Sequence, residues 1–335
     1  MPPVRLEVRA EKLRLAAPFR ISGYVFEETD AVVVTLTDGA HSGGGEAAGA
    51  YYLGDDLARM TSEIEAARGD IEAGIDRLWL QRLMPPGGGR NAVDCALWEL
   101  EAARAGVPAW RLAGVDAPRP LLTTFTLGAD SPEAMAEGAR GYAQARAIKV
   151  KLTGELDLDI ARVKAIRSAR QDVWLGVDAN QGYARGMLDS LIPALAEQRV
   201  ALLEQPLPRG AEAELDGYRS LIPIAADESA LTLDDLPGLV GRFNVVNIKL
   251  DKCGGLTEGL AMASEARELG LGVMVGNMVG TSLAMAPAFI LGQQCDIVDL
   301  DGPTFLARDR DQAVVYNDGL IDCGDEVWGG GAPAR

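Results

Sequence analysis

Histidine is the scarcest chemically reactive residue of this chain, with a single copy, His41, among 335 residues. It lies in residues 38–43, a segment with Asp and Gly that predicts a hairpin turn at the surface. Mechanisms that need a histidine base or a serine–histidine pair therefore lack their main residue. Lysine becomes the best available general base.

Cysteine is also sparse and dispersed. The four copies are Cys95, Cys253, Cys295 and Cys323, with no C-x-x-C pair among them. This count and spacing argue against a disulfide framework, and together with the single histidine they argue against a zinc site. We expect Cys95 and Cys253 to act as small buried hydrophobic residues.

Long apolar runs and an excess of positive charge are missing as well. No stretch of about 18 uncharged apolar residues occurs, and no apolar core follows a basic N-terminal start. The chain has 32 Lys and Arg against 49 Asp and Glu, a net charge of −17, which repels nucleic acid and anionic lipid surfaces. We expect a soluble cytoplasmic protein without nucleic-acid or membrane partners. The sequence is compatible with a monomer and with a homo-oligomer.

Two kinds of segment divide the chain. The first predicts an α+β domain at 1–115, with strands at 4–15, 31–37 and 44–50 and helices at 55–84 and 90–106. The second, at 116–305, alternates short apolar runs with helical stretches, and eight strands with helical crossovers predict an α/β fold with a parallel barrel. Its strands are expected near 121–127, 145–152, 173–178, 200–204, 222–226, 244–249, 272–276 and 295–300. We expect residues 306–335 to pack back on the first domain.

Six charged side chains lie at the ends of these predicted strands. They are Lys149, Lys151, Asp178, Glu204, Asp227 and Lys249. From Lys151 onward the intervals are 27, 26, 23 and 22 residues, each about one strand plus one helix of a βαβ unit. If each residue ends a barrel strand, all six side chains meet at one mouth, where such barrels carry their active sites. The spacing predicts a metal-assisted proton-transfer enzyme.

Three carboxylates in succession follow apolar strands that we predict to be buried: Asp178, Glu204 and Asp227. A buried carboxylate is costly unless it is paired or bound to a metal. At this spacing the three favour an oxygen-ligand site that suits Mg²⁺. Three separate helix N-caps or ion pairs are the alternative.

Lys149 and Lys151 are two residues apart in a predicted strand, so both side chains point into the barrel. Two neighbouring ammonium groups raise each other's energy and favour the neutral amine, which is a competent base. Lys249, from the far side of the barrel, is expected to face Lys151 across a bound substrate.

This set of residues resembles the enolase superfamily, muconate-lactonizing subgroup. The resemblance extends from Pro18-Phe19 through Arg90-Asn91-Ala92 to Asp299-Leu300-Asp301-Gly302-Pro303. It implies a capping domain completed by the C-terminal segment, a modified TIM barrel of the (β/α)7β-like type, and a bound Mg²⁺. The shared half-reaction that it implies is removal of a proton beside a carboxylate.

Within that subgroup the chain is most similar to the dipeptide epimerases, which are isomerases. The resemblance assigns the substrate ammonium to Asp299 and Asp301, which lie on one face of a strand; a structural salt bridge is the alternative. It implies Mg²⁺ on the three carboxylates with Lys149 assisting, and Lys151 and Lys249 on opposite faces of the α-carbon. Asn180 and Ser229 are expected to orient the ligands.

The second residue of the dipeptide would meet the segment 20–30, which has arginine only at its start, Arg20. Tyr24 and Phe26 offer apolar contact there, with several acids nearby. We expect hydrophobic or cationic second residues. Alternatives are L-Ala-D/L-Glu epimerase specificity, or an N-acylamino acid racemase, o-succinylbenzoate synthase or cycloisomerase of the same subgroup. A non-catalytic binder is least favoured, because the lysines and the three carboxylates are all present.

Overall fold

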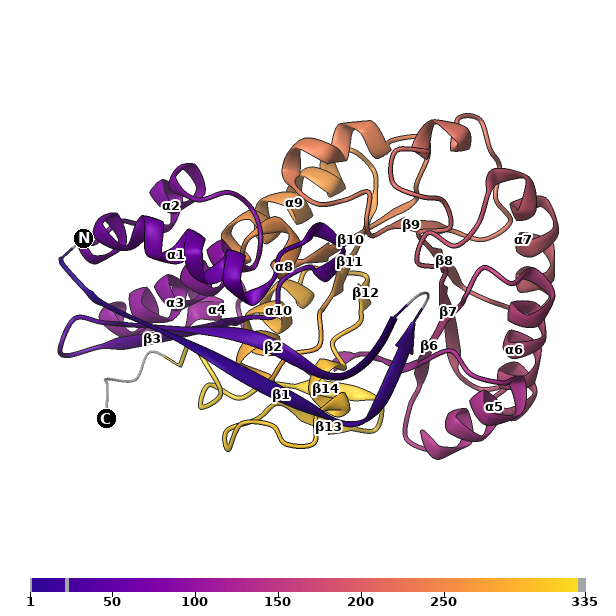
Figure 1. Cartoon of the computed structure of the whole chain (residues 1–335), viewed down its shortest axis with the longest axis horizontal. Helices are drawn as coiled ribbons and strands as arrows, with labels where there is room; N and C mark the ends of the chain where they lie inside the picture. The colour runs from indigo at the N-terminus through magenta and orange to yellow at the C-terminus, as the bar shows by residue number, and fades with distance from the viewer. Residues whose placement is uncertain (1, 22–23, 331–335) are drawn as a thin grey trace.

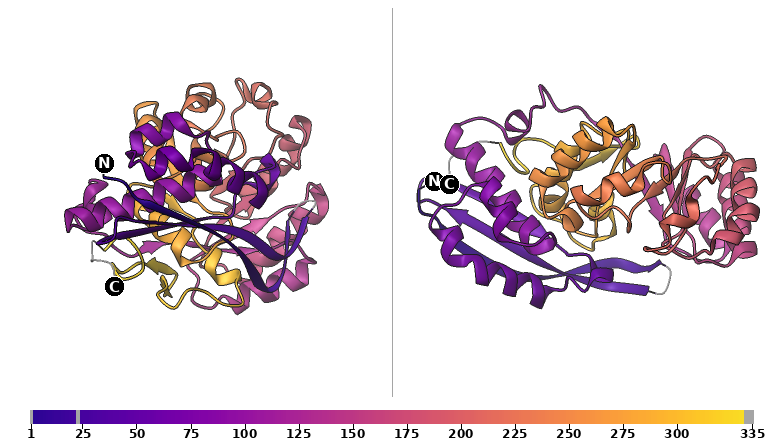
Figure 2. Two further views of the ribbon diagram at one scale, coloured as in Figure 1. Left: turned by 60° about the vertical axis from the view of Figure 1, so that its left-hand side comes forward. Right: turned by 90° about the horizontal axis from the view of Figure 1, so that it is seen from above.

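The computed structural model describes residues 2–21 and 24–330, and for Ile21 and Tyr24 it describes the backbone only. The molecule is elongated, with the N-terminal sheet and helices at one end and the barrel at the other (Figure 1). A long hairpin from the N-terminal end reaches across to the barrel, which is visible from the side and from above (Figures 1 and 2).

Three antiparallel strands form the N-terminal sheet: β1 (Arg5–Ile21), β2 (Tyr24–Thr37) and β3 (Ser42–Ala47). The first two are longer than predicted, because residues 19–21 pair with residues 24–26 beyond a register shift between Arg14 and Phe19. Phe19 pairs with Phe26 there. Outside residues 22 and 23, which are not described, the predicted specificity loop therefore belongs to a two-stranded ribbon.

Helices α1 (Leu57–Glu72) and α3 (Gly88–Ala105) pack on this sheet, and α2 (Arg77–Leu83) and α4 (Ala109–Leu112) pack on α3. The short helix η1 (Tyr51–Leu53) precedes α1. The predicted helical segment at 55–84 is divided between α1 and α2, because Asp76 caps a new helix at the amide of Trp79. Helix α3 lies directly on β3, where a Cβ on Gly45 would meet the carbonyl oxygen of Ala92 at 2.1 Å. Only glycine permits this close approach.

Eight parallel strands form the barrel, in the order β12-β11-β10-β9-β8-β7-β6-β5. They are β5 (Thr124–Leu127), β6 (Ala147–Lys151), β7 (Trp174–Asp178), β8 (Leu202–Glu204), β9 (Ile224–Ala226), β10 (Val245–Lys249), β11 (Gly272–Gly276) and β12 (Ile297–Val298). The predicted modified barrel with a capping domain is confirmed, and the sheet is nearly closed.

The crossovers differ in kind. Five contain α-helices: α5 (Pro132–Gly141), α6 (Leu156–Ala169), α7 (Leu188–Glu197) after η2 (Arg185–Met187), α9 (Leu256–Glu268) after α8 (Leu250–Cys253), and α10 (Ser282–Gly292). The two that follow β8 and β9 contain only the 3₁₀ helices η3 (Glu212–Leu215) and η4 (Leu233–Leu239). Among the four intervals from Lys151 to Lys249, these two crossovers have the shortest, 23 and 22 residues.

The first and last strands of the barrel, β5 and β12, are joined by hydrogen bonds in which side chains take part. Thr123 Oγ1 accepts from the amide of Leu300 at 2.9 Å, and Asp301 Oδ2 accepts from the amide of Thr126 at 2.6 Å. Asp299 accepts from the hydroxyl of Thr124. The two aspartates of the predicted ammonium site thus also close the barrel.

The C-terminal segment follows η5 (Gly302–Phe305) and touches both parts of the molecule. Its strands β13 (Val315–Asn317) and β14 (Leu320–Asp322) form a sheet with β4 (Leu121–Leu122). Trp328 Nε1 donates to the carbonyl of Gly44 at 2.8 Å, and the amide of Ala109 donates to Gly329 at 2.7 Å. This segment therefore joins the barrel to the N-terminal elements.

The residues that are scarce in the sequence have structural positions. All four cysteines are free thiols, and Cys95 and Cys253 are buried as predicted. His41 lies in the turn between β2 and β3, next to Asp38. No helix within the described part of the chain is long and apolar enough to cross a membrane.

Candidate active site at the barrel mouth

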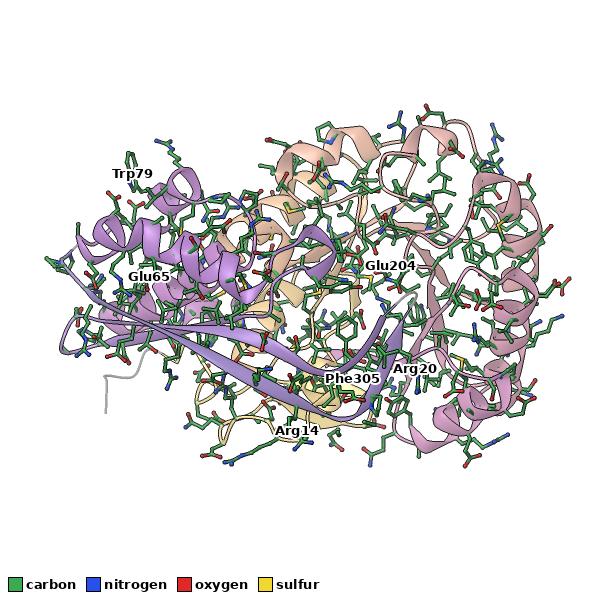
Figure 3. The ribbon with its side chains drawn as sticks, viewed as in Figure 1. Arg14, Arg20, Glu65, Trp79, Glu204 and Phe305 are labelled. Carbon is green, nitrogen blue, oxygen red and sulfur yellow. The ribbon has the colours of Figure 1, made fainter. Side chains whose placement is uncertain are left out.

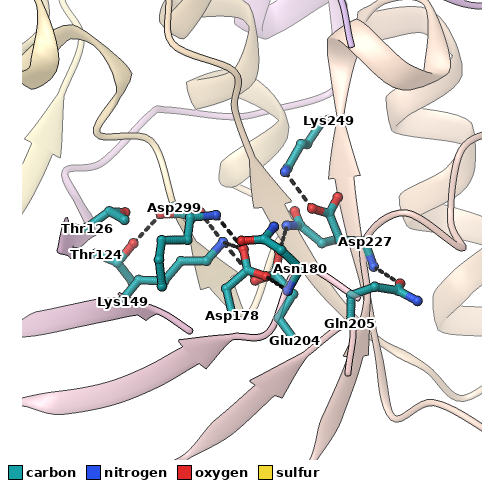
Figure 4. A network of polar contacts seen from close by, with 12 residues as sticks. Thr124, Thr126, Lys149, Asp178, Asn180, Glu204, Gln205, Asp227, Lys249 and Asp299 are labelled. Atoms are coloured by element: carbon teal, nitrogen blue, oxygen red, sulfur yellow. Dashed lines mark hydrogen bonds and ion pairs between the residues drawn. The ribbon is translucent and has the colours of Figure 1, made fainter. Parts of the chain in front are cut away.

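Consecutive barrel strands end in the predicted charged residues. Lys151 is the last residue of β6, Asp178 of β7, Glu204 of β8 and Lys249 of β10, and Asp227 directly follows β9. In the register, Lys151 lies opposite Asp178, and Asp178 lies opposite Glu204. The parallel sheet thereby carries all five to the same end of the barrel. Figure 4 shows the polar network around Asp178, Glu204, Asp227 and Lys249.

Asp178, Glu204 and Asp227 form a compact buried triad. One carboxylate oxygen from each lies within 4.8 Å of the others, and none of the three residues is more than 1% exposed. Burial and the neighbouring Asp178 raise the pKa of Glu204 to about 7. Burial also disfavours the charge of Asp178, but Lys151 and Lys149 outweigh it and lower the pKa of that residue to about 2.

Lys149 is bound by carboxylates on three sides. Its Nζ is 2.8 Å from Asp299 Oδ2, 2.8 Å from Glu204 Oε2 and 3.2 Å from Asp178 Oδ2. Burial lowers the pKa of Lys149, but these carboxylates raise it well above its usual range. The prediction that the two strand lysines favour a neutral amine was wrong for Lys149, because the acids around it outweigh its lysine neighbour.

Lys151 and Lys249 flank the triad. Their strands, β6 and β10, are separated in the sheet by the three strands that carry the carboxylates. Lys151 Nζ is 2.6 Å from Asp178 Oδ2, and Lys249 Nζ is 2.6 Å from Asp227 Oδ2. Burial lowers the pKa of Lys249, but Asp227 raises it above the usual range. The two amines therefore approach the mouth from opposite sides.

Three supporting residues escaped the sequence analysis. Lys252 Nζ, fully buried, lies 2.6 Å from Asp227 Oδ1. Asn247 Nδ2 donates to Glu204 Oε1 at 2.9 Å, and Gln205 Oε1 accepts from the amide of Asp227 at 2.9 Å. Lys252 follows Lys249 by three residues in the one-turn helix α8, so the i, i+3 spacing was the signal that could have identified it.

The two predicted orienting residues, Asn180 and Ser229, differ in their distance from the triad: one contacts it directly and the other does not. The amide of Asn180 donates to Asp178 Oδ1 at 3.0 Å, so this residue contacts the triad. Ser229 Oγ contacts Gln205 Nε2 at 2.9 Å and Glu212 Oε1 at 2.7 Å. It therefore reaches the triad through Gln205. The prediction for Tyr24 concerns a side chain outside the described residues.

A cavity opens above the triad, with about 730 Å³ of empty space that includes its opening to solvent. Lys151, Lys249 and Asp227 line its floor, and apolar and aromatic side chains line its walls: Leu15, Phe19, Phe26, Tyr51, Tyr52, Met278 and Val279. Arg20 is exposed, lies beside Phe305 (Figure 3), and lines a separate cavity between the hairpin and residues 126–130 of the barrel.

Comparison with known proteins gives the arrangement a family. The family model described as Enolase C-terminal domain-like matches residues 133–326, more than half of the chain. L-Ala-D/L-Glu epimerase of Escherichia coli (strain K12) is 40% identical over 318 residues, which are 94% of this chain and 98% of that protein. The chain belongs to the enolase superfamily.

Further known proteins are similar to this chain over most of its length. N-acetyl-D-glutamate racemase of Pseudoalteromonas sp is 38% identical over 89% of this chain and 95% of its own. A solved enolase family member from Agrobacterium tumefaciens, with bound sodium and L-Ala-L-Glu, has a TM-score of 0.93 at 39% identity and covers 98% of this chain and 100% of its own. A dipeptide epimerase from Enterococcus faecalis V583 complexed with Mg and L-Leu-L-Tyr has a TM-score of 0.90 at 28% identity and covers 100% of both. The predicted isomerase class, similar to dipeptide epimerases, is confirmed.

The triad of this enolase-superfamily chain fits a divalent metal ion. Three buried carboxylates whose oxygens lie within 4.8 Å of one another repel each other, and the raised pKa of Glu204 reports that repulsion together with burial. Carboxylate oxygens are the donors that hard divalent cations prefer. The donor set is therefore suited to such an ion.

Proposed function

We propose that the chain catalyses Mg²⁺-dependent epimerisation of dipeptides by proton transfer at the carbon next to the carboxylate. One observation carries the proposal: Lys151 and Lys249 reach the mouth from opposite sides of the buried triad. Inversion requires a proton acceptor on one face of the carbon and a proton donor on the other. Similar proteins are dipeptide epimerases, which supports a dipeptide as the substrate.

Each lysine would serve one face of the substrate. In one direction the neutral amine of Lys151 removes the α proton, and the ammonium of Lys249 delivers a proton to the opposite face. In the other direction the two exchange roles. Lys149 would hold a fixed positive charge beside the substrate carboxylate, because Asp299 and Glu204 keep it in place.

Asp178, Glu204 and Asp227 would hold the Mg²⁺. When bound, the ion would supply positive charge that stabilises the carboxylate as negative charge develops and would weaken the hold of the triad on the lysine protons. Asn247, Gln205 and Lys252 keep the carboxylates in position through the bonds described above.

A direct experiment tests the proposal. The protein is loaded with Mg²⁺ and incubated in D₂O with a library of L-Ala-L-X dipeptides, and ¹H NMR follows the α-proton signal of the second residue. We expect that signal to disappear as both epimers accumulate deuterium. Absence of exchange from every dipeptide would rule out the proposed activity.

The ammonium of the dipeptide is assigned to Asp301. Asp299 is already bonded to Lys149 and Thr124, whereas among the described residues no lysine or arginine forms an ion pair with Asp301. Burial and the neighbouring Asp299 raise the pKa of Asp301 to about 7, so a cation beside it would relieve that strain. Because Asp299 is engaged, of these two aspartates only Asp301 is left to bind a substrate ammonium. An N-acylamino acid racemase, whose substrate has no free ammonium, is therefore the second candidate.

Asp301→Asn is expected to weaken dipeptides selectively. A charge-assisted contact is worth roughly 1.5–3 kcal/mol, so kcat/KM for L-Ala-L-X should fall about ten- to a hundredfold, and that for N-acetylated analogues much less. Asp322→Asn, on the exposed side of β14, is the control and should change neither. If the parent protein turns over N-acylamino acids better than dipeptides, the racemase replaces the epimerase.

The side chain of the second residue is assigned to the apolar walls of the cavity. Two of the acids that could have favoured a cationic side chain are engaged elsewhere: Glu28 pairs with Lys12, and Asp55 Oδ2 accepts from the amide of Gly88 at 2.6 Å. No arginine is among the residues that line this cavity in the described part of the chain. The pocket therefore favours hydrophobic second residues over glutamate.

Relative kcat/KM values for L-Ala-L-Leu, L-Ala-L-Lys and L-Ala-L-Glu test this assignment. Burial of a leucine side chain is worth roughly 1.5–3 kcal/mol, so we expect L-Ala-L-Leu to exceed L-Ala-L-Glu by about tenfold or more, with L-Ala-L-Lys between them. A preference for L-Ala-L-Glu, the dipeptide bound in the Agrobacterium tumefaciens structure, would contradict the apolar pocket.

A further inference from the structure

Asp251 connects the barrel to the N-terminal domain at the rim of the cavity. It lies in α8, two residues after Lys249, and is 6% exposed. Its Oδ1 accepts from the amide of Ala48 and from the amide of Gly49, both at 2.9 Å. One carboxylate oxygen thereby fixes two consecutive amides that belong to a different domain.

The segment that Asp251 holds is part of the cavity wall. Ala48 and Gly49 line the cavity and lead into η1, which carries Tyr51 and Tyr52. Gly49 has φ +73°, and a Cβ there would meet the carbonyl oxygen of Asp55 at 2.1 Å. The turn is therefore tightly packed, and a shift at Ala48 and Gly49 would be transmitted to the tyrosines.

Aromatic contacts extend this wall to the hairpin. The rings of Tyr51 and Tyr52 meet edge to face with centroids 5.2 Å apart, and Tyr51 meets Phe26 of β2 at 5.3 Å. Such edge contacts depend on ring orientation. A continuous series of contacts thus leads from Asp251 through the turn and the tyrosines to the hairpin that covers the cavity.

We propose that Asp251 is a positioning residue that fixes the aromatic wall of the cavity relative to Lys249. This inference rests on the proposed function in one respect, namely that the cavity binds the side chain of the second residue of a dipeptide. Because Asp251 and Lys249 share the same turn, the wall that binds the side chain keeps a constant distance from the amine that transfers the proton. Loss of the Asp251 bonds would loosen the wall and weaken substrate binding more than it slows the chemical step.

Other bonds keep the two domains together without Asp251. The amide of Thr257 donates to Asp94 Oδ2 at 2.9 Å, and Trp98 Nε1 donates to the hydroxyl of Thr257 at 3.0 Å. Glu46 accepts from the amide of Thr281 at 2.7 Å and pairs with Arg310 at 2.6 Å. A variant at position 251 therefore retains a docked domain.

Two variants separate the accepting oxygen from the rest of the side chain. Asp251→Ala removes it, whereas Asp251→Asn keeps a carbonyl oxygen that can accept both amide protons. Asp296→Ala is the control, because Asp296 accepts from the amide of Val273 at 2.9 Å at the opposite end of the barrel. The readouts are amide hydrogen exchange of residues 48–53 and, for a dipeptide substrate, kcat and KM.

For Asp251→Ala we expect exchange at 48–53 to accelerate and KM to rise about tenfold, with kcat changed less than about threefold, since the lost bonds involve a charged acceptor. Asp251→Asn should restore both, and Asp296→Ala should change neither. Asp251→Glu displaces the oxygen by one methylene and should give an intermediate effect, so it serves as the test should the alanine variant not fold.

Unchanged exchange at 48–53 in Asp251→Ala would overturn the proposal, as would a fall in kcat at constant KM. An asparagine variant as impaired as the alanine variant would overturn it too, because the accepting oxygen would then not be the cause. The exchange measurement needs no substrate. It therefore decides on Asp251 even if the parent protein proves inactive on every dipeptide.

Discussion

Lys249→Ala is expected to abolish epimerisation, with kcat falling by about 10²- to 10⁴-fold. The amine of Lys249 is the proton-transfer group on the β10 side of the triad, and the neighbouring Lys252 is buried against Asp227 and the carbonyl of Asn247. Lys151→Ala should have the same effect on epimerisation. Each variant should retain α-proton exchange from the one stereoisomer whose proton faces the lysine that remains.

The matched control is Lys164→Ala, which removes an exposed lysine from α6 and should leave activity unchanged. Chiral chromatography of the products and ¹H NMR of the substrate in D₂O give the two rates. Equal loss of exchange from both stereoisomers in both lysine variants would show that the lysines do not serve separate faces.

Removal of the metal is expected to have the second large effect. Chelation should abolish activity, and Mg²⁺ should restore it. Without a cation, Asp178 and Asp227 form ion pairs with Lys151 and Lys249 and keep both amines protonated, so neither can accept the substrate proton. Glu204→Gln keeps the shape of the side chain and removes one of three ligand charges. We expect it to lower the affinity for Mg²⁺ by at least about tenfold, as even outer-shell substitutions do.

Titration calorimetry of the chelated protein with Mg²⁺ measures that affinity independently of turnover. Glu197→Gln, at an exposed position near the end of α7, is the control for a loss of one negative charge. Full activity after chelation, or an affinity of Glu204→Gln equal to that of the parent protein, would contradict the assignment of the triad.

The position of the charged residues could be predicted because a parallel barrel constrains it. Each strand ends at the same mouth, so the spacing from Lys151 to Lys249 sufficed to bring five side chains together. These are properties of chain connectivity, which the sequence records directly.

Side-chain partners could not be predicted in the same way. Lys149 is surrounded by acids from β7, β8 and the end of β12, and this depends on packing across the barrel. The engagement of Asp55 by the amide of Gly88 follows from how α3 docks. The hairpin end at 16–30 lacks a regular apolar alternation, so its pairing depends on the register set by the rest of β1 and β2.

The central claim is that two lysines on opposite sides of one carbon exchange its proton. The most direct measurement uses one pure stereoisomer, L-Ala-L-Leu, with Mg²⁺-loaded protein in D₂O, and determines the isotope at the α-carbon of the product at low conversion. We predict that the epimer formed carries deuterium, because a different amine, equilibrated with solvent, supplies its hydrogen. An epimer that retains the original protium would show that a single group moves the proton between the two faces, and it would contradict the account.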